Sequence, residues 1–261
     1  MIVSIPARGL AAQQPTLGDD TERNLGCMNI VCGMDGCKAG WVAITKDLSS
    51  GRISSRLCVS VRELVRNESS VQVFAIDIPI GLRERGPRTC DREARRLLGR
   101  GRSSSVFPAP IRPVLAASSY NAACQIRLQE EGKKLSRQAW EIVYKIREVD
   151  ELLRQTLKLQ SMFREVHPEV SFFFLAGGQP MRHSKKKRAG KEERRKLLEP
   201  IFGHWLHSAL AERRDLACNE DDILDAFAAL WTAERIASGI SQTIPTAPQK
   251  DSFGLCMEIV A

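Results

Sequence analysis

The sequence lacks the features of several large protein classes. No apolar run reaches the ~18 residues that a membrane-spanning helix needs, which argues against a helical membrane protein. None of the eight cysteines forms a CxxC pair, and no Cys/His group has the spacing of zinc ligands. Scattered single cysteines are typical of free thiols in a reducing compartment. We therefore predict a cytoplasmic protein with no membrane partner.

The first 28 residues lack hydrophobic periodicity and also lack a basic start followed by an apolar core, so a secretory signal is not expected. We predict a disordered extension over residues 1–28, with the ordered chain beginning near residue 29. The sequence leaves open whether the biological start is Met1 or Met28.

The composition itself is ordinary for a globular protein. Of the 261 residues, 43% are hydrophobic and 27% are charged, and the length allows one large domain or two small ones. The net charge of +8 is unevenly placed, because residues 83–102 carry a net +5 and residues 185–196 a net +6. Two basic stretches on a slightly acidic body favour an anionic partner such as nucleic acid, with solvated loops as the alternative.

Hydrophobic patterning predicts an α/β protein with a mixed sheet. Short apolar runs separated by turn signals predict three antiparallel strands and a short helix before a fourth, fully buried strand. Later segments alternate strand and helix character, which predicts parallel strands with helices on the sheet. The expected strands are 29–35, 40–46, 52–59, 71–78 and 164–175, the last interrupted at Pro168, and the expected helices are 60–66, the helical region 89–160, 191–210 with a break at Pro200, and 220–238.

Four carboxylates stand out by their positions. Asp35 ends the first predicted strand and Asp77 ends the fourth, while Asp222 and Asp225 lie three residues apart and share a face of the last helix. Small residues on that face would let the helix lie close to the sheet. Clustered carboxylates repel one another unless cations compensate, and hard divalent ions prefer oxygen ligands. We therefore expect all four to hold one or two Mg²⁺ or Mn²⁺ ions.

Structural explanations compete with this interpretation. An acidic residue in a first helical turn favours the helix dipole, and for Asp222 alone that explanation is sufficient. Asp77 interrupts an apolar strand, where an unpaired charge is costly, although a hydrogen bond to a turn could stabilise it.

Several separated motifs resemble one known family. The resemblance covers roughly residues 29–239 and is to the family catalogued as domain of unknown function 429, described as predicted nucleases of the RNase H-like fold. The motifs are GMDGCKAGW (33–41), AIDIPIGL (75–82), CDREAR (90–95), SSVFPAP (104–110), EVHPEVSF (165–172) and DDILDAFAALWTA (221–233).

The resemblance implies a fold and a site. It implies one RNase H-like domain over residues 29–240, with a helical insertion at about 89–160 between the fourth and fifth strands and a C-terminal tail over 241–261. In that superfamily a first-strand Asp, a fourth-strand carboxylate and last-helix carboxylates bind metal, which matches Asp35 and Asp77. Asp222 and Asp225 are similar to the DxxDA pattern of RuvC-type resolvases.

Further residues are candidates for substrate contacts. Glu169, in the HPE motif, is a metal or substrate ligand or else caps a turn. Lys38 follows Asp35 and is either a phosphate contact or a plain loop lysine. Four arginines could position a nucleic-acid backbone without reading its bases; they are Arg88, Arg92, Arg95 and Arg96.

Together these observations predict a divalent-metal-dependent nuclease that hydrolyses phosphodiester bonds of DNA or RNA, which by analogy leaves a 5′-phosphate and a 3′-hydroxyl. Two alternatives remain at this stage. One is a nucleic-acid-binding protein that keeps the fold but does not cut. The other, which the sequence supports less, is a nucleotide phosphate enzyme of the actin-like class. The sequence does not specify the substrate, the cleavage mode or the oligomeric state.

Overall fold

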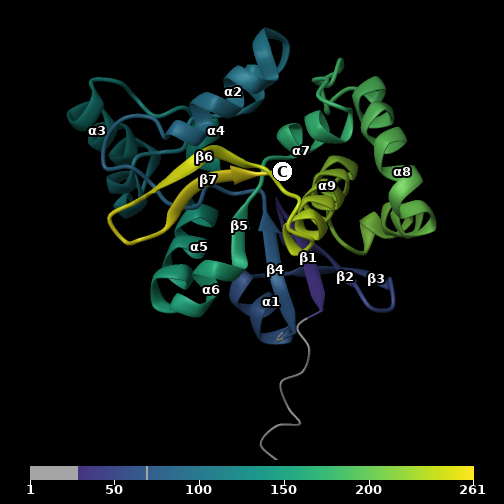
Figure 1. Ribbon diagram of the computed structural model, residues 1–261. Coiled ribbons are helices and arrows are strands. Elements are labelled where there is room, and N and C mark those ends of the chain that lie inside the picture. The colour runs from purple at the N-terminus through teal and green to yellow at the C-terminus, as the bar shows by residue number, and fades with distance from the viewer. Residues whose placement is uncertain (1–28, 69) are drawn as a thin grey trace, which may run out of the picture.

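A mixed five-stranded sheet forms the framework of the protein in the computed structural model, which describes residues 29–68 and 70–261 (Figure 1). Its strands are β1 (Ile30–Cys37), β2 (Gly40–Asp47), β3 (Ile53–Cys58), β4 (Val71–Ile76) and β5 (Phe163–Glu165). Their order is β3-β2-β1-β4-β5. The first three pair antiparallel, whereas β4 and β5 run parallel to β1 and to each other. This confirms the predicted fold class and is consistent with an RNase H-like arrangement.

Helices lie on both sides of the sheet and account for most of the remaining chain. They are α1 (Val61–Asn67), α2 (Thr89–Arg102), α3 (Tyr120–Glu131), α4 (Arg137–Glu141), α5 (Val143–Gln155), α6 (Leu157–Met162), α7 (Pro168–Leu175), α8 (Arg188–Ala211) and α9 (Glu220–Ala237), with 3₁₀ turns η2 (Ser103–Ser105), η3 (Arg112–Ala116) and η4 (Glu212–Arg214). The segment from α2 to α6 separates β4 from β5 in the chain, as the predicted helical insertion requires.

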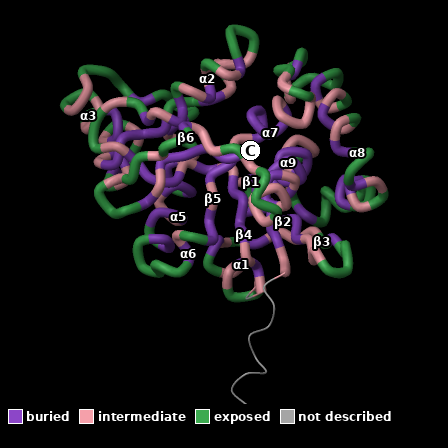
Figure 2. Tube along the Cα trace, viewed as in Figure 1, coloured by how far each residue is buried: buried purple, intermediate pink, exposed green. Residues whose placement is uncertain are grey.

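The centre of the molecule is where α9 packs directly on β1, and both are buried (Figure 2). Gly33 makes this close approach possible, because a Cβ there would lie 2.1 Å from the backbone nitrogen of Leu230. The small residues Ala226, Ala229 and Ala233 are fully buried along the helix. This contact sets the position of the first turns of α9 relative to the ends of the central strands.

Three expectations from the sequence need correction. The strand predicted over 164–175 ends at Glu165, because Pro168 begins helix α7 and its missing N–H suits a first helical turn. The break expected at Pro200 instead lies at Gly203, whose φ of 49° falls in the left-handed region. The segment 241–261, predicted as a tail, forms a hairpin of β6 (Thr243–Lys250) and β7 (Cys256–Val260).

Two further expectations concern the first 28 residues and membrane-spanning helices. The disordered extension predicted for residues 1–28 lies outside the described residues. In the described part of the chain, no helix combines the length and the apolar character needed to cross a membrane.

Candidate carboxylate site at the ends of the central strands

Asp35 and Asp77 lie at the same edge of the sheet because β1 and β4 are parallel neighbours. Met34 pairs with Ile76, and the N–H of Asp77 donates to the carbonyl of Met34 at 3.0 Å. Asp35 is 7% exposed, and one of its oxygens accepts from the N–H of Gly36 at 2.8 Å. The two carboxylates therefore follow the same pair of the central ladder, Met34 with Ile76, although β1 itself continues to Cys37 rather than ending at Asp35.

Asp225 joins them from helix α9. Its side chain is 1% exposed, and it lines the same cavity as Asp35 and Asp77. One oxygen, Oδ2, accepts from the Nζ of Lys185, whereas Oδ1 is buried without a hydrogen-bond partner among the described residues. A buried carboxylate oxygen without a partner is energetically costly, so it marks a position where a further donor or cation would be stabilising.

Asp222 has a different role from the one predicted. Its carboxylate accepts from the N–H of Asn219 at 2.7 Å and completes a capping box at the start of α9. It is near enough for its charge to raise the pKa of Asp35, yet it is not among the residues that line the cavity. The capping explanation accounts for its position, so we place three carboxylates rather than four at the site.

The pKa values report how closely the three groups interact. Burial raises the pKa of Asp35 well above its usual range, and the negative charges of Asp77 and Asp225 raise it further. Burial likewise raises the pKa of Asp77 to about 7, where the positive charge of Lys185 opposes the shift and Asp225 adds to it. Like charges held close together in a buried place produce this pattern.

Lys185 supplies the cation of the cluster. It lies in the segment between α7 and α8, and the charge of Asp225 raises its pKa, as do those of Asp35 and Asp77, so it stays protonated. Gly190 positions this segment, because a Cβ there would lie 2.0 Å from the carbonyl oxygen of Ser184. The sequence predicted a basic stretch here but did not single out this lysine from Lys186 and its neighbours.

Glu169 lies beside the three carboxylates, in the first turn of α7. It is 6% exposed and forms an ion pair with the fully buried Arg194 of α8, while its Oε2 has no partner among the described residues. Its N–H donates to Nδ1 of His167 at 3.2 Å. Burial lowers the pKa of His167, which is therefore neutral near pH 7. The unpartnered Oε2 suits the predicted role of a ligand, and the ion pair with Arg194 suits the alternative role of a structural carboxylate.

Arg88 does not fit the predicted role of a phosphate contact. Its side chain is 3% exposed, and the guanidinium forms ion pairs with both Glu165 and Asp91. It also donates to the carbonyls of Ile80 and Gly81 at 3.1 and 3.3 Å. All four partners lie inside the protein, so the guanidinium of Arg88 stabilises the loop after β4 rather than binding a phosphate.

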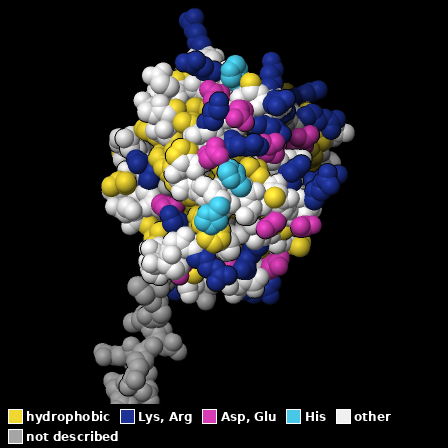
Figure 3. All heavy atoms as spheres, turned by 90° about the vertical axis from the view of Figure 1, so that its right-hand side faces the viewer, with side chains coloured by type: hydrophobic (Ala, Val, Ile, Leu, Met, Phe, Trp, Pro, Cys, Tyr) yellow, Lys and Arg dark blue, Asp and Glu magenta, His cyan; other side chains and the backbone are white. Residues whose placement is uncertain are grey.

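The other predicted cationic contacts lie nearer the surface. Arg92, Arg96 and Lys38 are exposed, whereas Arg95 is half-buried and donates to the carbonyl of Val106 at 2.6 Å. None of these four is among the residues that line the cavity. Figure 3 shows Lys and Arg side chains gathered, with Asp and Glu among them, on the face at the right-hand side of Figure 1.

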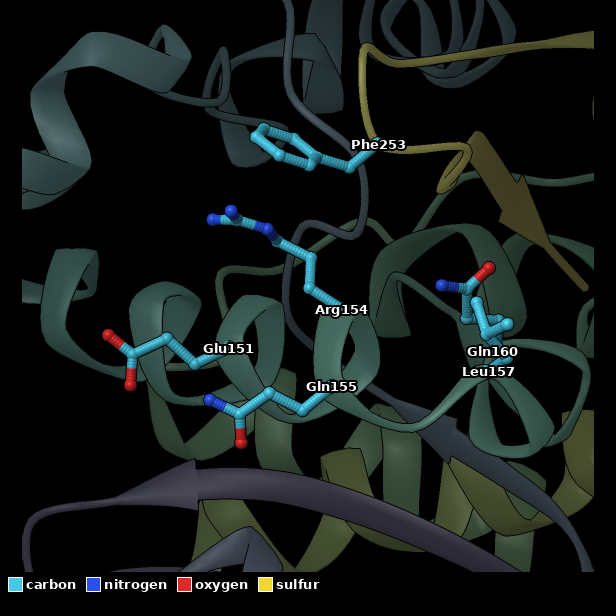
Figure 4. Close-up of a pocket in the computed structure, with 6 residues that line it drawn as sticks. All are labelled: Glu151, Arg154, Gln155, Leu157, Gln160 and Phe253. Carbon is cyan, nitrogen blue, oxygen red and sulfur yellow. The ribbon is translucent and has the colours of Figure 1, made fainter.

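The three carboxylates share a cavity of about 560 Å³. Its walls come from the ends of β1 and β4, from α9, from the turn after α2, from α4 and from the segment before α8. A second hollow of about 490 Å³ lies on α5 and α6, where Arg154 packs 3.6 Å over the ring of Phe253 (Figure 4). That hollow has one carboxylate, Glu151, so it offers no comparable cluster.

The carboxylate oxygens of the cluster suit a hard divalent cation, but their arrangement in this structure does not enclose one. Carboxylate oxygens are the ligands that Mg²⁺ and Mn²⁺ prefer, and the unpartnered Oδ1 of Asp225 is such an oxygen. Among residues 29–68 and 70–261, however, no group of three or more His, Cys, Asp and Glu side chains is arranged so that it could hold a metal ion. Lys185 already places one positive charge beside Asp225, at its Oδ2.

Comparisons with known proteins give one family. A family model described as a protein of unknown function (DUF429) matches residues 33–250. No curated protein and no solved structure gives a significant match. Because the matched region spans most of the chain and includes Asp35, Asp77 and Asp225, the resemblance noted in the sequence motifs is confirmed at the level of the family. The chain belongs to the DUF429 family.

Proposed function

We propose that this protein is a divalent-metal-dependent nuclease that hydrolyses phosphodiester bonds of nucleic acid. The observation that carries the proposal is the convergence of Asp35, Asp77 and Asp225 from three separate elements on one cavity. Their mutual repulsion and the unpartnered Oδ1 of Asp225 support a site that would gain from a bound cation. In this proposal, the ions are Mg²⁺ or Mn²⁺.

Different residues would bind the ion, support the cavity wall and attract the substrate at the proposed site. Asp35, Asp77 and Asp225 would hold the ion, and Lys185 would leave Asp225 when the ion binds. An ion held there activates water and stabilises negative charge on the phosphoryl oxygens during hydrolysis. The neutral His167 and the Arg194–Glu169 pair keep the neighbouring wall in place. The exposed lysines near Lys185 would attract the phosphate backbone without reading sequence.

A reducing, cytoplasmic location is part of the proposal. The seven cysteines within residues 29–68 and 70–261 are all free thiols, as expected for proteins of a reducing compartment.

One experiment tests the proposed activity directly. Purified protein is incubated with labelled single strands, duplexes, RNA–DNA hybrids and branched DNA in Mg²⁺ or Mn²⁺. We expect cleavage that Asp35→Asn and Asp77→Asn abolish. Asp222→Asn is the matched control, because an Asn can still cap α9, and it should retain activity. Cleavage that survives both Asp35→Asn and Asp77→Asn would place the chemistry elsewhere.

A second candidate, a nucleic-acid-binding protein that does not cut, is favoured by one observation. The ion pair of Lys185 with Asp225 already compensates part of the acidic charge, so the cluster is not obliged to bind a metal. For this candidate, binding would be equally strong in metal-free buffer and in Mg²⁺, with no turnover on any of the substrates above.

A further inference from the structure

The cavity that holds the carboxylates is also lined by an aromatic residue, Phe107, that the proposed chemistry does not use. Phe107 lines the cavity and is 46% exposed, although it directly follows the buried Val106. Within the part of the chain that the structure describes, its ring forms no aromatic pair and lies under no cation. An exposed aromatic ring that lines a cavity is a surface on which a flat apolar group can stack.

The backbone that leads to this ring is held by two hydrogen bonds. Nε of Arg102 donates to the carbonyl of Met181 at 2.6 Å, which ties the end of α2 to the segment before α8. Nη1 of Arg95 donates to the carbonyl of Val106 at 2.6 Å, directly before the ring. The backbone at Phe107 is therefore held at the cavity, and the loss of conformational entropy when a ligand stacks on the ring would be small.

Neighbouring side chains complete a surface for a nucleobase. Ile142 contributes a half-buried apolar side chain, and Gln138 contributes an exposed amide with both donors and an acceptor. These two residues and Phe107 all come from the helical insertion, whereas the carboxylates come from the sheet edge and α9. The cavity thus contains side chains suited to a flat base, and the segment before α8 contributes Lys185 and Lys186, which suit a phosphate.

The size of the cavity restricts what can enter it. About 560 Å³ lies within the range of small-molecule pockets, roughly 300–1,000 Å³, a class of ligand that includes a single nucleotide. A base inside an intact duplex cannot reach such a pocket without leaving its stack, and that costs free energy. A base in a single strand pays much less, because it is already unpaired.

We propose that this cavity binds one nucleotide of a single strand, with its base on Phe107 and its phosphate toward the carboxylates. The inference rests on the proposed function for the direction of the phosphate, and it names single-stranded nucleic acid as the substrate class. The insertion between β4 and β5 supplies the base-binding wall, and the RNase H-like core supplies the acidic wall.

Fluorescence anisotropy in EDTA tests the proposal without any metal. The probes are a fluorescein-labelled twelve-nucleotide oligothymidylate and a labelled blunt hairpin duplex of equal charge. We expect the single strand to bind at least tenfold more tightly than the duplex. Phe107→Ala should weaken single-strand binding about tenfold, because stacking on an aromatic ring contributes roughly 1–3 kcal/mol per base. Phe107→Trp should retain binding.

Matched variants separate stacking from general damage. Phe253→Ala removes a similarly exposed Phe (45%) from the other hollow, and it should leave binding unchanged (Figure 4). Phe107→Leu keeps an apolar side chain without a ring and should bind like Phe107→Ala. Equal binding of strand and duplex, or full binding by Phe107→Ala with an unchanged melting temperature, would overturn the proposal.

Competition and cleavage measurements separate failure of this pocket from failure of the proposed nuclease activity. Thymidine monophosphate should displace the strand only at a much higher concentration than unlabelled oligothymidylate does; tighter binding of the free nucleotide would overturn the assignment to a strand. Cleavage of duplex in Mn²⁺ that Phe107→Ala leaves intact would reject this pocket but keep the nuclease. Single-strand binding that needs Phe107 without cleavage would reject the nuclease but keep the pocket.

Discussion

Lys185 donates to the carboxylate of Asp225 although 40 residues separate them in the chain. The pair joins the segment before α8 to a buried turn of α9, and it places one fixed positive charge beside three acidic groups. This charge is the feature on which metal binding, stability and phosphate attraction at the site all depend.

Replacing Lys185 should strengthen metal binding. Lys185→Gln removes the charge that competes with a divalent ion for Asp225, and we expect Mg²⁺ or Mn²⁺ affinity to rise about tenfold by isothermal titration calorimetry. Lys186→Gln is the control, because Lys186 is exposed and belongs to the same basic run. If Lys185→Gln binds the ion no better than wild type, the cluster does not function as a metal site.

The metal-free protein should lose stability as the pH rises. The folded pKa values of Asp35 and Asp77 lie above the ordinary value near 4, so the folded state holds more protons than the unfolded chain between about pH 4 and pH 7. Stability contributed by these groups is therefore present at low pH and is lost as the pH rises through 7. Thermal melts in EDTA from pH 5.5 to 8.0 should fall by a few degrees more in wild type than in Asp77→Asn. Equal slopes would show that Asp77 is ionised throughout.

Gly33→Ala should disrupt the contact that positions Asp225. The added Cβ would meet the backbone of α9 at Leu230 and Ala226, which cannot move aside as a flexible side chain does. We expect a loss of about 3 kcal/mol or more in the free energy of unfolding, measured with urea. Gly101→Ala is the control, because a Cβ there meets no atom within 4 Å. A small effect at Gly33 would mean that α9 is not tightly docked on β1.

The Arg194–Glu169 pair should behave as a buried ion pair. Arg194→Met leaves Glu169 charged and unpaired, with an expected loss of about 3–5 kcal/mol. The double variant Arg194→Met with Glu169→Leu should recover much of that loss, because no buried charge remains. If the double variant is as unstable as the single one, the bonds from Arg194 to the carbonyls of His183 and Gly190 are the more important contribution.

The sequence was sufficient for the sheet and for three of the carboxylates. Alternating and continuous apolar runs place the strands, and a carboxylate directly after a buried strand, such as Asp77, is visible without coordinates. Motifs shared with one family also implied an RNase H-like mixed sheet, whereas the order of its strands comes from the structure. Local sequence signals predict secondary structure less well where tertiary packing determines it. The apolar run after Pro168 suits a strand, yet it forms helix α7.

By itself, then, the sequence determined the mixed sheet, the last helix with its small-residue face, and the positions of Asp35, Asp77 and Asp225, because hydrophobic periodicity and strand ends are local properties. Only the tertiary structure decided that Asp222 caps a helix, that Arg88 pairs with internal partners, that Lys185 is the lysine of its run that pairs with Asp225, and that Phe107 lines the cavity of the carboxylates. The reason is that ion pairs and cavity walls join residues far apart in the chain, and their partners depend on how helices and loops pack around the sheet.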